Sequence, residues 1–479
     1  MSAVAQTVAT GADADAGSPK ARGAIGKEAR AHAPRSSHGD WQPAADRPDP
    51  VQILLDQAEG RVPELLALRY GRMLVSPFSF FRGAAAIMAA DLAPTPTSGL
   101  RVQLCGDAHL SNFGTFSSPE RALVFDISDF DETLPGPWEW DVKRLAASVC
   151  IAGRDREFKS KQIAHAVAQT VAAYREAMNS FAQQGNLDVW YADLDVDEIS
   201  RLFSVGVDVK RMKKLERELE QARLNTSVKA LGKLTETAGG QVRFLHKPPL
   251  LVPVDELLTG VGREQAERNL KGLLSDYRDS LPENRRTLLD GYHYVSMARK
   301  VVGVGSVGMR VWVILLYGRD GSDPLLLQAK EATASVLEKH LDPPFHGNHA
   351  ERVVEGQKLM QAASDIFLGW LAATGPVGGT RDYYLRQAAD GKGAIDISLL
   401  LPAGLADYGR LCGWTLARAH ARAGDRIAIS GYLGSGDAFD RAVAAFAERY
   451  ADQNEDDYKA LKEAVDSGRV EAAKEDASE

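Results

Sequence analysis

The chain of 479 residues is 44% hydrophobic and 25% charged, a composition that supplies a globular core without difficulty. Its net charge of −8 argues against nucleic acid or an anionic membrane as the main partner. Three widely spaced cysteines, no apolar run of transmembrane length and no hydrophobic signal core predict a cytoplasmic protein that is not secreted by the signal-peptide route.

The first 48 residues are rich in Ala, Gly, Ser, Arg and Asp and hold few large apolar side chains. They are therefore predicted to form a disordered tail. Helical periodicity begins at Val51 and continues to the helix breaker Pro94–Gly99. We predict a mainly helical lobe over residues 49–294.

Two polar segments that each follow a predicted strand hold most of the reactive residues. GDAHLSNFG (Gly106–Gly114) follows the strand Arg101–Cys105, and VFDISDFDET (Val124–Thr133) includes the end of the strand Ala122–Ile127. Carboxylates and an asparagine at two neighbouring strand ends can hold a divalent cation and the anionic group that it carries. The alternative is that these Asp and Asn residues simply form turns.

Long helices are predicted next. Trp138–Arg154 has an apolar face, and helical periodicity then extends over about Ser160–Glu236. The charged run KRMKKLERELEQARL within that stretch is interpreted as a solvated helix face, not as a binding patch.

The pattern changes near residue 295, and residues 295–392 are predicted to form a β-rich lobe. GVGSVG (Gly303–Gly308) fits G-x-G-x-x-G, but a strand follows it instead of the helix that a dinucleotide fingerprint requires. A glycine loop inside a hairpin is the arrangement with which protein kinases cover nucleotide phosphates. The next strand ends in LQAKEA, which puts Lys330 where that hairpin carries its phosphate-pairing lysine. The alternative is an edge strand protected by one charge.

A helix is predicted over Ala350–Leu371. Its Glu355 is the candidate partner of Lys330, as the helix glutamate is in kinases, and Glu351 is the competitor one turn earlier.

One more strand and several helices complete the prediction. The strand is Arg381–Gln387, and an amphipathic helix covers Tyr408–Asp425. His420 on that helix is interpreted as a packed or capping histidine. Residues 393–479 are predicted to be helices that pack on the helical lobe.

The motif pair GDAHLSN and DFDE resembles that of the kinase-like small-molecule phosphotransferases, such as the aminoglycoside and choline kinases. Together with SPFSFFRG, PWEWDVKRLAAS, GVGSVG, LQAKEA and LARAHARAGD, it also resembles an uncharacterised bacterial family, domain of unknown function 2252, over about residues 50 to 460. That family name implies no activity, so the chemical expectations come from the kinase resemblance.

The kinase resemblance implies a role for each site residue. Asp107 would orient and deprotonate the acceptor hydroxyl, and Lys330 and Glu355 would complete the catalytic set. The ligands of Mg²⁺ would come from the two polar segments: Asn112, Asp129 and Asp131, with Asp126 as a further alternate.

The same resemblance implies ATP as the cofactor. Asp141 would brace the catalytic loop, although a helix N-terminal carboxylate is an equally good interpretation of this residue. The ATP phosphates would be bound by the hairpin residues Gly303, Gly305, Ser306, Gly308 and Lys330.

Motif order departs from that of kinases, because the glycine loop and the lysine follow the catalytic loop here instead of preceding it. A circular permutation opened just before the catalytic loop explains this order, since contacts and not chain order define a core. The predicted fold is α+β: a two-lobed, circularly permuted protein-kinase-like fold with helical insertions. It requires the Lys330 ammonium to lie within roughly 10 Å of the Asp129 carboxylate. It also requires the helix Tyr408–Asp425 to pack beside the strand leading into Asp107.

These observations predict an ATP- and Mg²⁺-dependent phosphotransferase that acts on a hydroxyl of an unknown small molecule. Its partners would be the nucleotide and that acceptor, with neither nucleic acid nor membrane involved, and the oligomeric state is unknown. Two alternatives stay open. One is a metal-dependent phosphoesterase, based on the D-x-H spacing of Asp107 and His109 and on the triplet Gly347–His349. The other is a catalytically silent kinase-like nucleotide-binding module.

Overall fold

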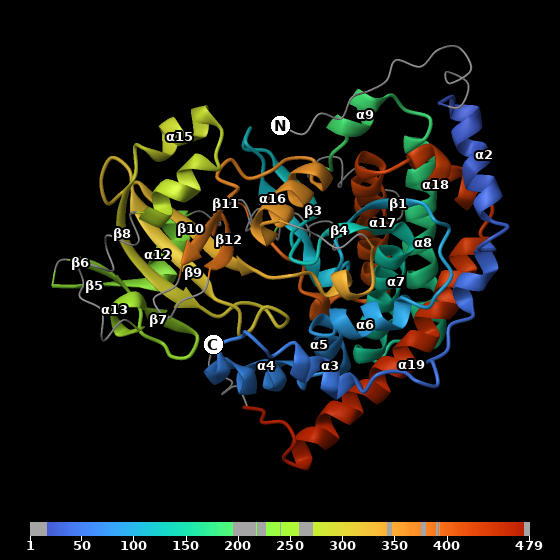
Figure 1. The fold of residues 1–479 in the computed structure, drawn as a ribbon, viewed down its shortest axis with the longest axis horizontal. Coiled ribbons are helices and arrows are strands. Elements are labelled where there is room, and N and C mark those ends of the chain that lie inside the picture. Colours follow the sequence, from blue (N-terminus) through green and yellow to red (C-terminus); the bar gives the residue numbers. More distant parts are fainter. Residues whose placement is uncertain are drawn as a thin grey trace.

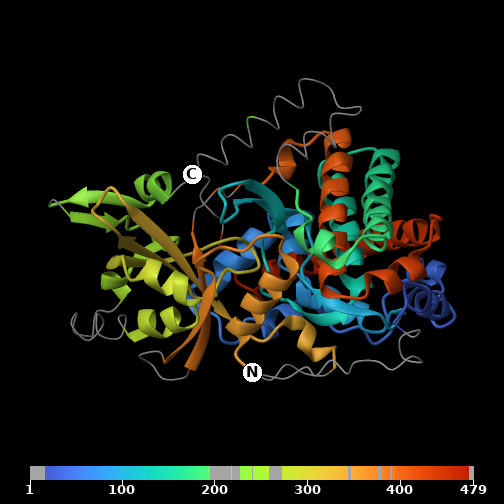
Figure 2. The same cartoon turned by 90° about the horizontal axis from the view of Figure 1, so that it is seen from above.

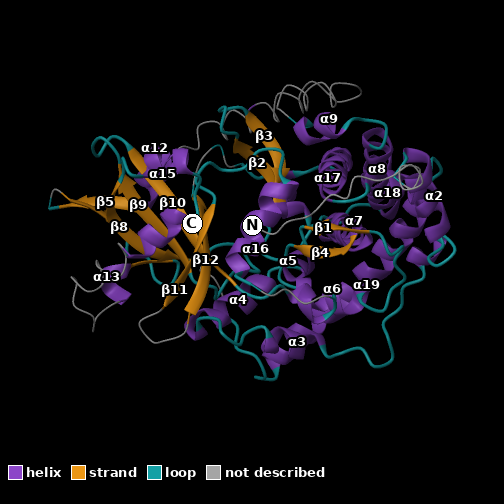
Figure 3. Ribbon diagram, turned by 45° about the horizontal axis from the view of Figure 1, so that its top comes forward, coloured by secondary structure: helices purple, strands orange, loops and turns teal. Residues whose placement is uncertain are grey.

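The computed structural model describes residues 17–194, 227–239, 241–257, 272–342, 347–374, 380–388 and 393–473, together with Arg217 and Gly391. Helices gather on one side of the molecule and most strands on the other, so the fold belongs to the mixed α+β class (Figure 1, Figure 3). Among the described residues, no helix is both long and apolar enough to span a membrane.

The helical side is built around α7 (Trp138–Asp155), which is buried from Trp138 to Gly153. Next to it, α8 and α17 are so close that a Cβ atom at Gly413 would lie 2.3 Å from the Thr170 carbonyl oxygen. Small residues at such a crossing let two helix backbones approach each other. The other helices on this side are α2 (Pro19–Ala29), α3 (Pro50–Asp56), α4 (Leu66–Met73), α5 (Pro77–Arg82), α6 (Ala85–Leu92), α8 (Ser160–Phe181), α9 (Asn186–Tyr191), α17 (Pro402–Ala423), α18 (Arg426–Leu433) and α19 (Ala438–Asp466).

Two short antiparallel ribbons lie between these helices and the large sheet (Figure 3). One pairs β1 (Arg101–Leu104) with β4 (Leu134–Pro137), and the other pairs β2 (Phe113–Ser117) with β3 (Leu123–Ile127). Both strands predicted in this region are confirmed, each with one end shifted by one residue.

Six antiparallel strands form the large sheet, in the order β11-β12-β10-β9-β8-β7. They lie side by side across the left of Figure 1, and Figure 2 shows the sheet and the long helices on opposite sides of the molecule. The strands are β7 (Leu251–Pro253), β8 (His293–Lys300), β9 (Val311–Tyr317), β10 (Pro324–Ala332), β11 (Gly369–Thr374) and β12 (Thr380–Gln387).

The sheet is covered on both faces, which explains why β9 is apolar without alternation. Val313 and Leu315 belong to one core cluster, and Ile314 and Leu316 to another on the opposite face. The first face is covered by α12 and the β5–β6 hairpin, and the second by residues 272–289. The covering elements are α12 (Ser227–Leu234), β5 (Thr235–Ala238), β6 (Gln241–Phe244) and α15 (Glu283–Leu289). The short helix α13 (Val254–Leu257) directly follows β7.

The sheet side begins earlier in the chain than the boundary predicted at residue 295, because β7 already pairs with β8. The helix predicted to run on to Leu371 ends at Met360, as α16 (His349–Met360). Residues from Gly369 onward instead form β11, because the apolar segment there pairs with β12 and contributes to the sheet core. The helical stretch predicted over about Ser160–Glu236 is helical at α8, α9 and α12, with a break after Phe181. The charged run KRMKKLERELEQARL lies, apart from Arg217, outside the described residues.

The prediction of a disordered tail is wrong for the part of it that the structure describes. α2 packs on α18 through backbone contacts and through polar bonds, so large apolar side chains are not needed. Arg22 pairs with Asp425 at 2.7 Å, and Arg30 donates to the carbonyl oxygens of Gly431 and Tyr432. Residues 1–16 lie outside the described residues.

Two glycines of α2 provide a matched test of this packing. A Cβ at Gly26 would lie 1.8 Å from the Ala428 carbonyl oxygen, whereas a Cβ at Gly23 meets nothing within 4 Å. Gly26→Ala should therefore lower the free energy of unfolding by about 1–3 kcal/mol. Gly23→Ala should leave it unchanged or raise it by up to about 1 kcal/mol, since Ala favours helix. Urea unfolding of both variants checks this, and equal effects would contradict the docking of α2.

Candidate active site

The loop after β1 is shaped by one glycine and one buried carboxylate. Gly106 has a φ of 83°, and a Cβ there would lie 2.3 Å from the Glu132 carbonyl oxygen, so only glycine fits. Asp141 of α7 accepts hydrogen bonds from the backbone amides of Cys105 and Gly106 at 2.8 and 3.0 Å. Of its two predicted roles, the structure therefore supports bracing of the loop.

His420 of α17 contacts Asp141, the residue that braces the loop. Its Nε2 lies 3.1 Å from an Asp141 carboxylate oxygen, its Nδ1 lies 2.9 Å from the Tyr174 hydroxyl, and the side chain is fully buried. The prediction of a packed histidine is confirmed. A Cβ at Gly424, just after α17, would lie 2.5 Å from the Val102 side chain of β1. The expected contact between this helix and the strand leading into Asp107 is confirmed as well.

Asp107 lies at the end of this braced loop. Its carboxylate accepts from Arg144 Nε at 2.6 Å and lies 3.6 Å from His109 Nε2. Burial raises the pKa of Asp107 above its ordinary value, and the Arg144 guanidinium opposes that rise. Asn112 donates through Nδ2 to the Asp107 carbonyl oxygen at 2.9 Å, which leaves its Oδ1 as an acceptor for a cation.

The turn after β3 brings two carboxylates to a lysine of the sheet. Lys330 Nζ lies 3.4 Å from an Asp129 carboxylate oxygen, so the expected proximity is confirmed across 201 residues of chain. Lys330 also pairs with Asp131, which accepts a 2.8 Å hydrogen bond from the Tyr384 hydroxyl. Burial alone would lower the pKa of Lys330, but the Asp129 and Asp131 carboxylates hold it well above the ordinary value.

One carboxylate of the sequence prediction lies apart from this cluster. Asp126, an alternate metal ligand in the sequence prediction, is fully buried, pairs with Arg418 and accepts from the Ala362 amide at 2.8 Å. Its role is to join the ribbon to α17 and to the segment after α16.

Glu355 does not pair with Lys330, so that prediction is wrong. It is exposed and pairs with Lys358 at 3.1 Å, and the competitor Glu351 is exposed too. The residue of α16 that contacts the turn after β3 is Arg352 instead. The Arg352 guanidinium donates to the carbonyl oxygens of Asp131, Thr133 and Thr333.

The glycine loop lies between β8 and β9, as predicted, and is bound by the N-terminal helices. Arg61 donates to the carbonyl oxygens of Gly305 and Val307 at 2.8 and 2.6 Å, and the Val62 amide donates to Gly308 at 2.7 Å. The Val304 and Val307 side chains are buried against this segment. These bonds use the loop carbonyls, and the amides of Gly305 and Ser306 have no partner among the described residues.

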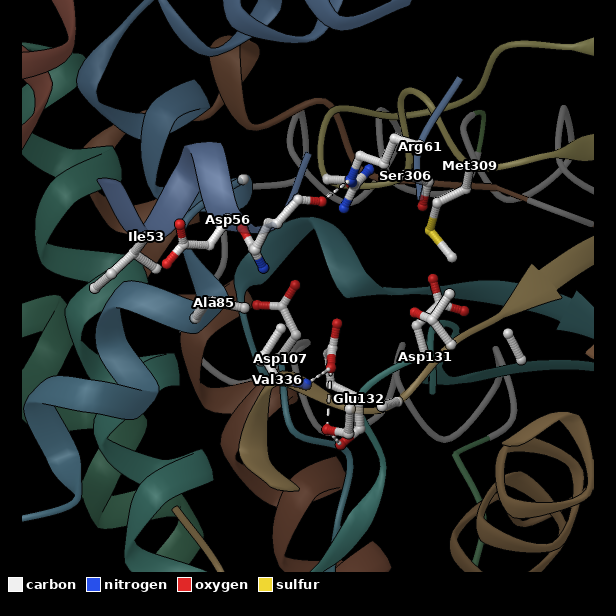
Figure 4. A pocket seen from close by; sticks show the side chains of 18 of the residues that line it. Ile53, Asp56, Arg61, Ala85, Asp107, Asp131, Glu132, Ser306, Met309 and Val336 are labelled. Atoms are coloured by element: carbon white, nitrogen blue, oxygen red, sulfur yellow. Dashed lines mark hydrogen bonds between the residues drawn. The ribbon is translucent and has the colours of Figure 1, made fainter. Parts of the chain in front are cut away.

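Two cavities meet at these groups. The first, of about 580 Å³, lies between the glycine loop and the carboxylates of Asp107, Asp131 and Glu132 (Figure 4). The second, of about 420 Å³, lies along β2 and the end of β12. Four residues line both cavities and so mark their junction: Arg82, Asn112, Asp129 and Gly303.

Sequence patterns did not single out several residues of this site. Arg144 orients Asp107, Arg61 binds the glycine loop, and Glu132 caps the turn at Ser335 and Val336. Arg144 lies in PWEWDVKRLAAS, a segment distinctive in sequence, but only the tertiary structure reveals its partner.

The triplet Gly347–His349 has a structural role, because Asn348 caps α16. Among the described residues, no group of three or more His, Cys, Asp or Glu side chains is arranged to hold a metal.

The chain belongs to a bacterial family described as "Uncharacterized protein conserved in bacteria (DUF2252)", whose family model matches residues 61–464. Comparison with curated proteins and with solved structures gives no match.

Glu132 should make the stability of the protein depend on pH in the neutral range. Burial raises the pKa of Glu132 from 4.5 to about 7, so the folded protein binds more protons than the unfolded chain between these values. This contribution to the free energy of unfolding is complete below the lower value and is lost as the pH rises through the higher one. Urea unfolding from pH 4 to 8 should show that fall in the wild type and a flatter profile in Glu132→Gln. Parallel profiles would contradict this assignment.

Proposed function

We propose that the protein is an ATP- and Mg²⁺-dependent phosphotransferase with a circularly permuted kinase-like fold, acting on a hydroxyl of a small molecule. The observation that carries the proposal is the meeting of Lys330 with Asp129 and Asp131 beside the glycine loop and Asp107. These groups come from opposite sides of the molecule. Together they supply a lysine for phosphate, carboxylates for metal and a base, which are the parts that phosphoryl transfer requires.

The order of elements on the sheet side supports the kinase-like part of the proposal. β8, the glycine loop, β9, the lysine strand β10, helix α16, β11 and β12 follow one another as the elements of a kinase small lobe do. β12 is then followed by α17, which packs beside the strand leading to the catalytic loop. A circular permutation that places the chain ends just before the catalytic loop would produce this order of elements.

The two cavities suit the two substrates. A nucleoside fits the size and lining of the second cavity, which Phe113 and Phe116 border, and its phosphates would then reach the junction with the first. The acceptor would enter the first cavity, where Asp107 lies.

The donor set at the junction fits Mg²⁺. Asn112 Oδ1 and the Asp129 carboxylate are hard oxygen ligands that line the same space, and the cation would take its remaining ligands from phosphate and water. When bound, Mg²⁺ neutralises phosphate charge. Lys330 holds the Asp129 and Asp131 carboxylates together and is placed to share them with that cation.

Asp107 acts on the acceptor. Its carboxylate accepts the hydroxyl proton while the acceptor oxygen bonds to the γ-phosphorus, the bond to the bridging oxygen breaks, and ADP leaves with that electron pair. Arg144 and the braced loop hold the carboxylate in one orientation. Burial raises the pKa of Asp107 and so strengthens it as a base.

Metal-dependent nucleotide binding should depend on Asp129. Asp129→Ala should abolish Mg²⁺-dependent ATP binding measured by calorimetry, because it removes a ligand and leaves Lys330 with one carboxylate fewer. Glu355→Gln is the matched control and should bind Mg²⁺–ATP as the wild type does, since Glu355 is exposed and pairs with Lys358 on the surface. Unchanged affinity in Asp129→Ala would contradict the assignment.

Transfer itself should depend on Asp107. Incubation with γ- and α-labelled ATP, Mg²⁺ and a metabolite extract should yield a γ-labelled product and so identify the acceptor. An α-labelled product would instead indicate adenylyl transfer. Asp107→Asn keeps the hydrogen bond from Arg144 and should retain ATP binding while losing roughly 10²-fold or more in turnover. Binding of ATP by the wild type without transfer to any acceptor would favour a silent nucleotide-binding module.

A further inference from the structure

Arg82 is the last residue of α5, and its side chain reaches the junction of the two cavities. The Nε atom is buried and has no hydrogen-bond partner, and no ion pair or hydrogen bond of Arg82 occurs within the described part of the chain. A buried donor without an acceptor destabilises the folded protein, and the rest of this half-buried side chain faces the two cavities. No group among the described residues explains this arginine, and an anionic ligand would.

The other arginines that line these cavities differ from Arg82 in one respect. Each has oxygen partners from the protein, so none offers a free donor set comparable to that of Arg82. The partners are Gly305 and Val307 for Arg61, Leu54 and Gln57 for Arg69, Glu331 for Arg381, and Ser128 and Gln328 for Arg386.

The neighbours of Arg82 identify which anion it meets. At the junction it lies with Asn112 and Asp129, the proposed metal ligands, and with Gly303 of the glycine loop. Burial lowers the pKa of Arg82, and the nearby negative charge of Asp107 opposes that lowering. A group placed between the metal ligands, the glycine loop and the base is the phosphoryl group in transit, not the adenosine and not the remote end of the acceptor.

We propose that Arg82 is a catalytic residue that donates hydrogen bonds to the phosphoryl group as it passes from ATP to the acceptor. The inference rests on the proposed function. As the acceptor oxygen bonds to the γ-phosphorus and the bond to the ADP oxygen breaks, negative charge spreads over the peripheral and bridging oxygens, and Asp107 takes the acceptor proton. An arginine fixed at that position favours this charge distribution over the ground state. Its planar donor set suits phosphoryl oxygens.

Aluminium fluoride with Mg²⁺ and ADP imitates the phosphoryl group in transit and needs no knowledge of the acceptor. Calorimetry of the full chain should show that aluminium fluoride tightens Mg²⁺–ADP binding in the wild type. Arg82→Ala should bind Mg²⁺–ADP within about threefold of the wild type but lose at least tenfold of that tightening. Arg82→Lys, which keeps the charge without the paired donors, should recover only part of it.

Arg381→Ala is the matched control. Arg381 lines the same cavity but already pairs with Glu331 at 2.8 Å, and Glu331 keeps Arg310 when Arg381 is removed. This variant should retain the full tightening. Far-ultraviolet circular dichroism and the retained Mg²⁺–ADP affinity separate loss of function from loss of fold.

The outcomes distinguish this inference from the proposed function. A wild type that binds neither Mg²⁺–ATP nor Mg²⁺–ADP overturns both. Equal tightening in the wild type and in Arg82→Ala overturns only the role of Arg82. Tightening that is absent from the wild type, despite normal Mg²⁺–ADP binding, also overturns that role, because no residue then responds to the transferring charge.

Discussion

The buried ammonium of Lys330 pairs the two sides of this molecule at the candidate site. Lys330 belongs to the six-stranded sheet, is only 3% exposed, and balances the charges of Asp129 and Asp131 in a turn that belongs to the other side. Removal of Lys330 would leave these two neighbouring carboxylates without their shared ammonium, which is far more costly than the loss of a surface ion pair. Tyr384, opposite Lys330 in the sheet register, donates to Asp131 and fixes the cluster from a second strand. The geometry of the cleft therefore depends on charge balance as much as on apolar packing.

Much of the site could be predicted because its residues occur in short sequence patterns that determine local backbone conformation. Glycines before an apolar strand predicted the hairpin loop between β8 and β9, and carboxylates after β3 predicted the turn that meets Lys330. Each of these patterns depends on backbone conformation within a few residues, and sequence specifies that well. The family to which the chain belongs was recognised from the same segments.

Other features could not be predicted because they depend on which surfaces meet. Periodicity places both Arg352 and Glu355 on one helix, but it does not say which of them turns toward the carboxylate turn, and Arg352 is the one that does. Composition made residues 17–48 resemble a tail, yet α2 docks through glycine-to-backbone contact and arginine bonds. Arg82 lies in SPFSFFRG, a segment that carries the family resemblance but indicates no chemical role. That Arg82 lines the junction of two cavities becomes clear only from the position of α5 in the structure.

The way the glycine loop is held links it to a distant part of the chain. Arg72 of α4 donates to the Gly303 carbonyl oxygen, and the Ala473 amide donates to the carbonyl oxygen of Ala67 in the same helix at 2.9 Å. Val470 is buried in the cluster that also contains Val304 of the loop. If nucleotide binding orders the loop, as the proposed function expects, amide hydrogen exchange around residue 470 should slow as well, since ligand binding and local opening are thermodynamically linked. Amide exchange at residues 470–473 would thus report ligand binding in cavities that these residues do not line.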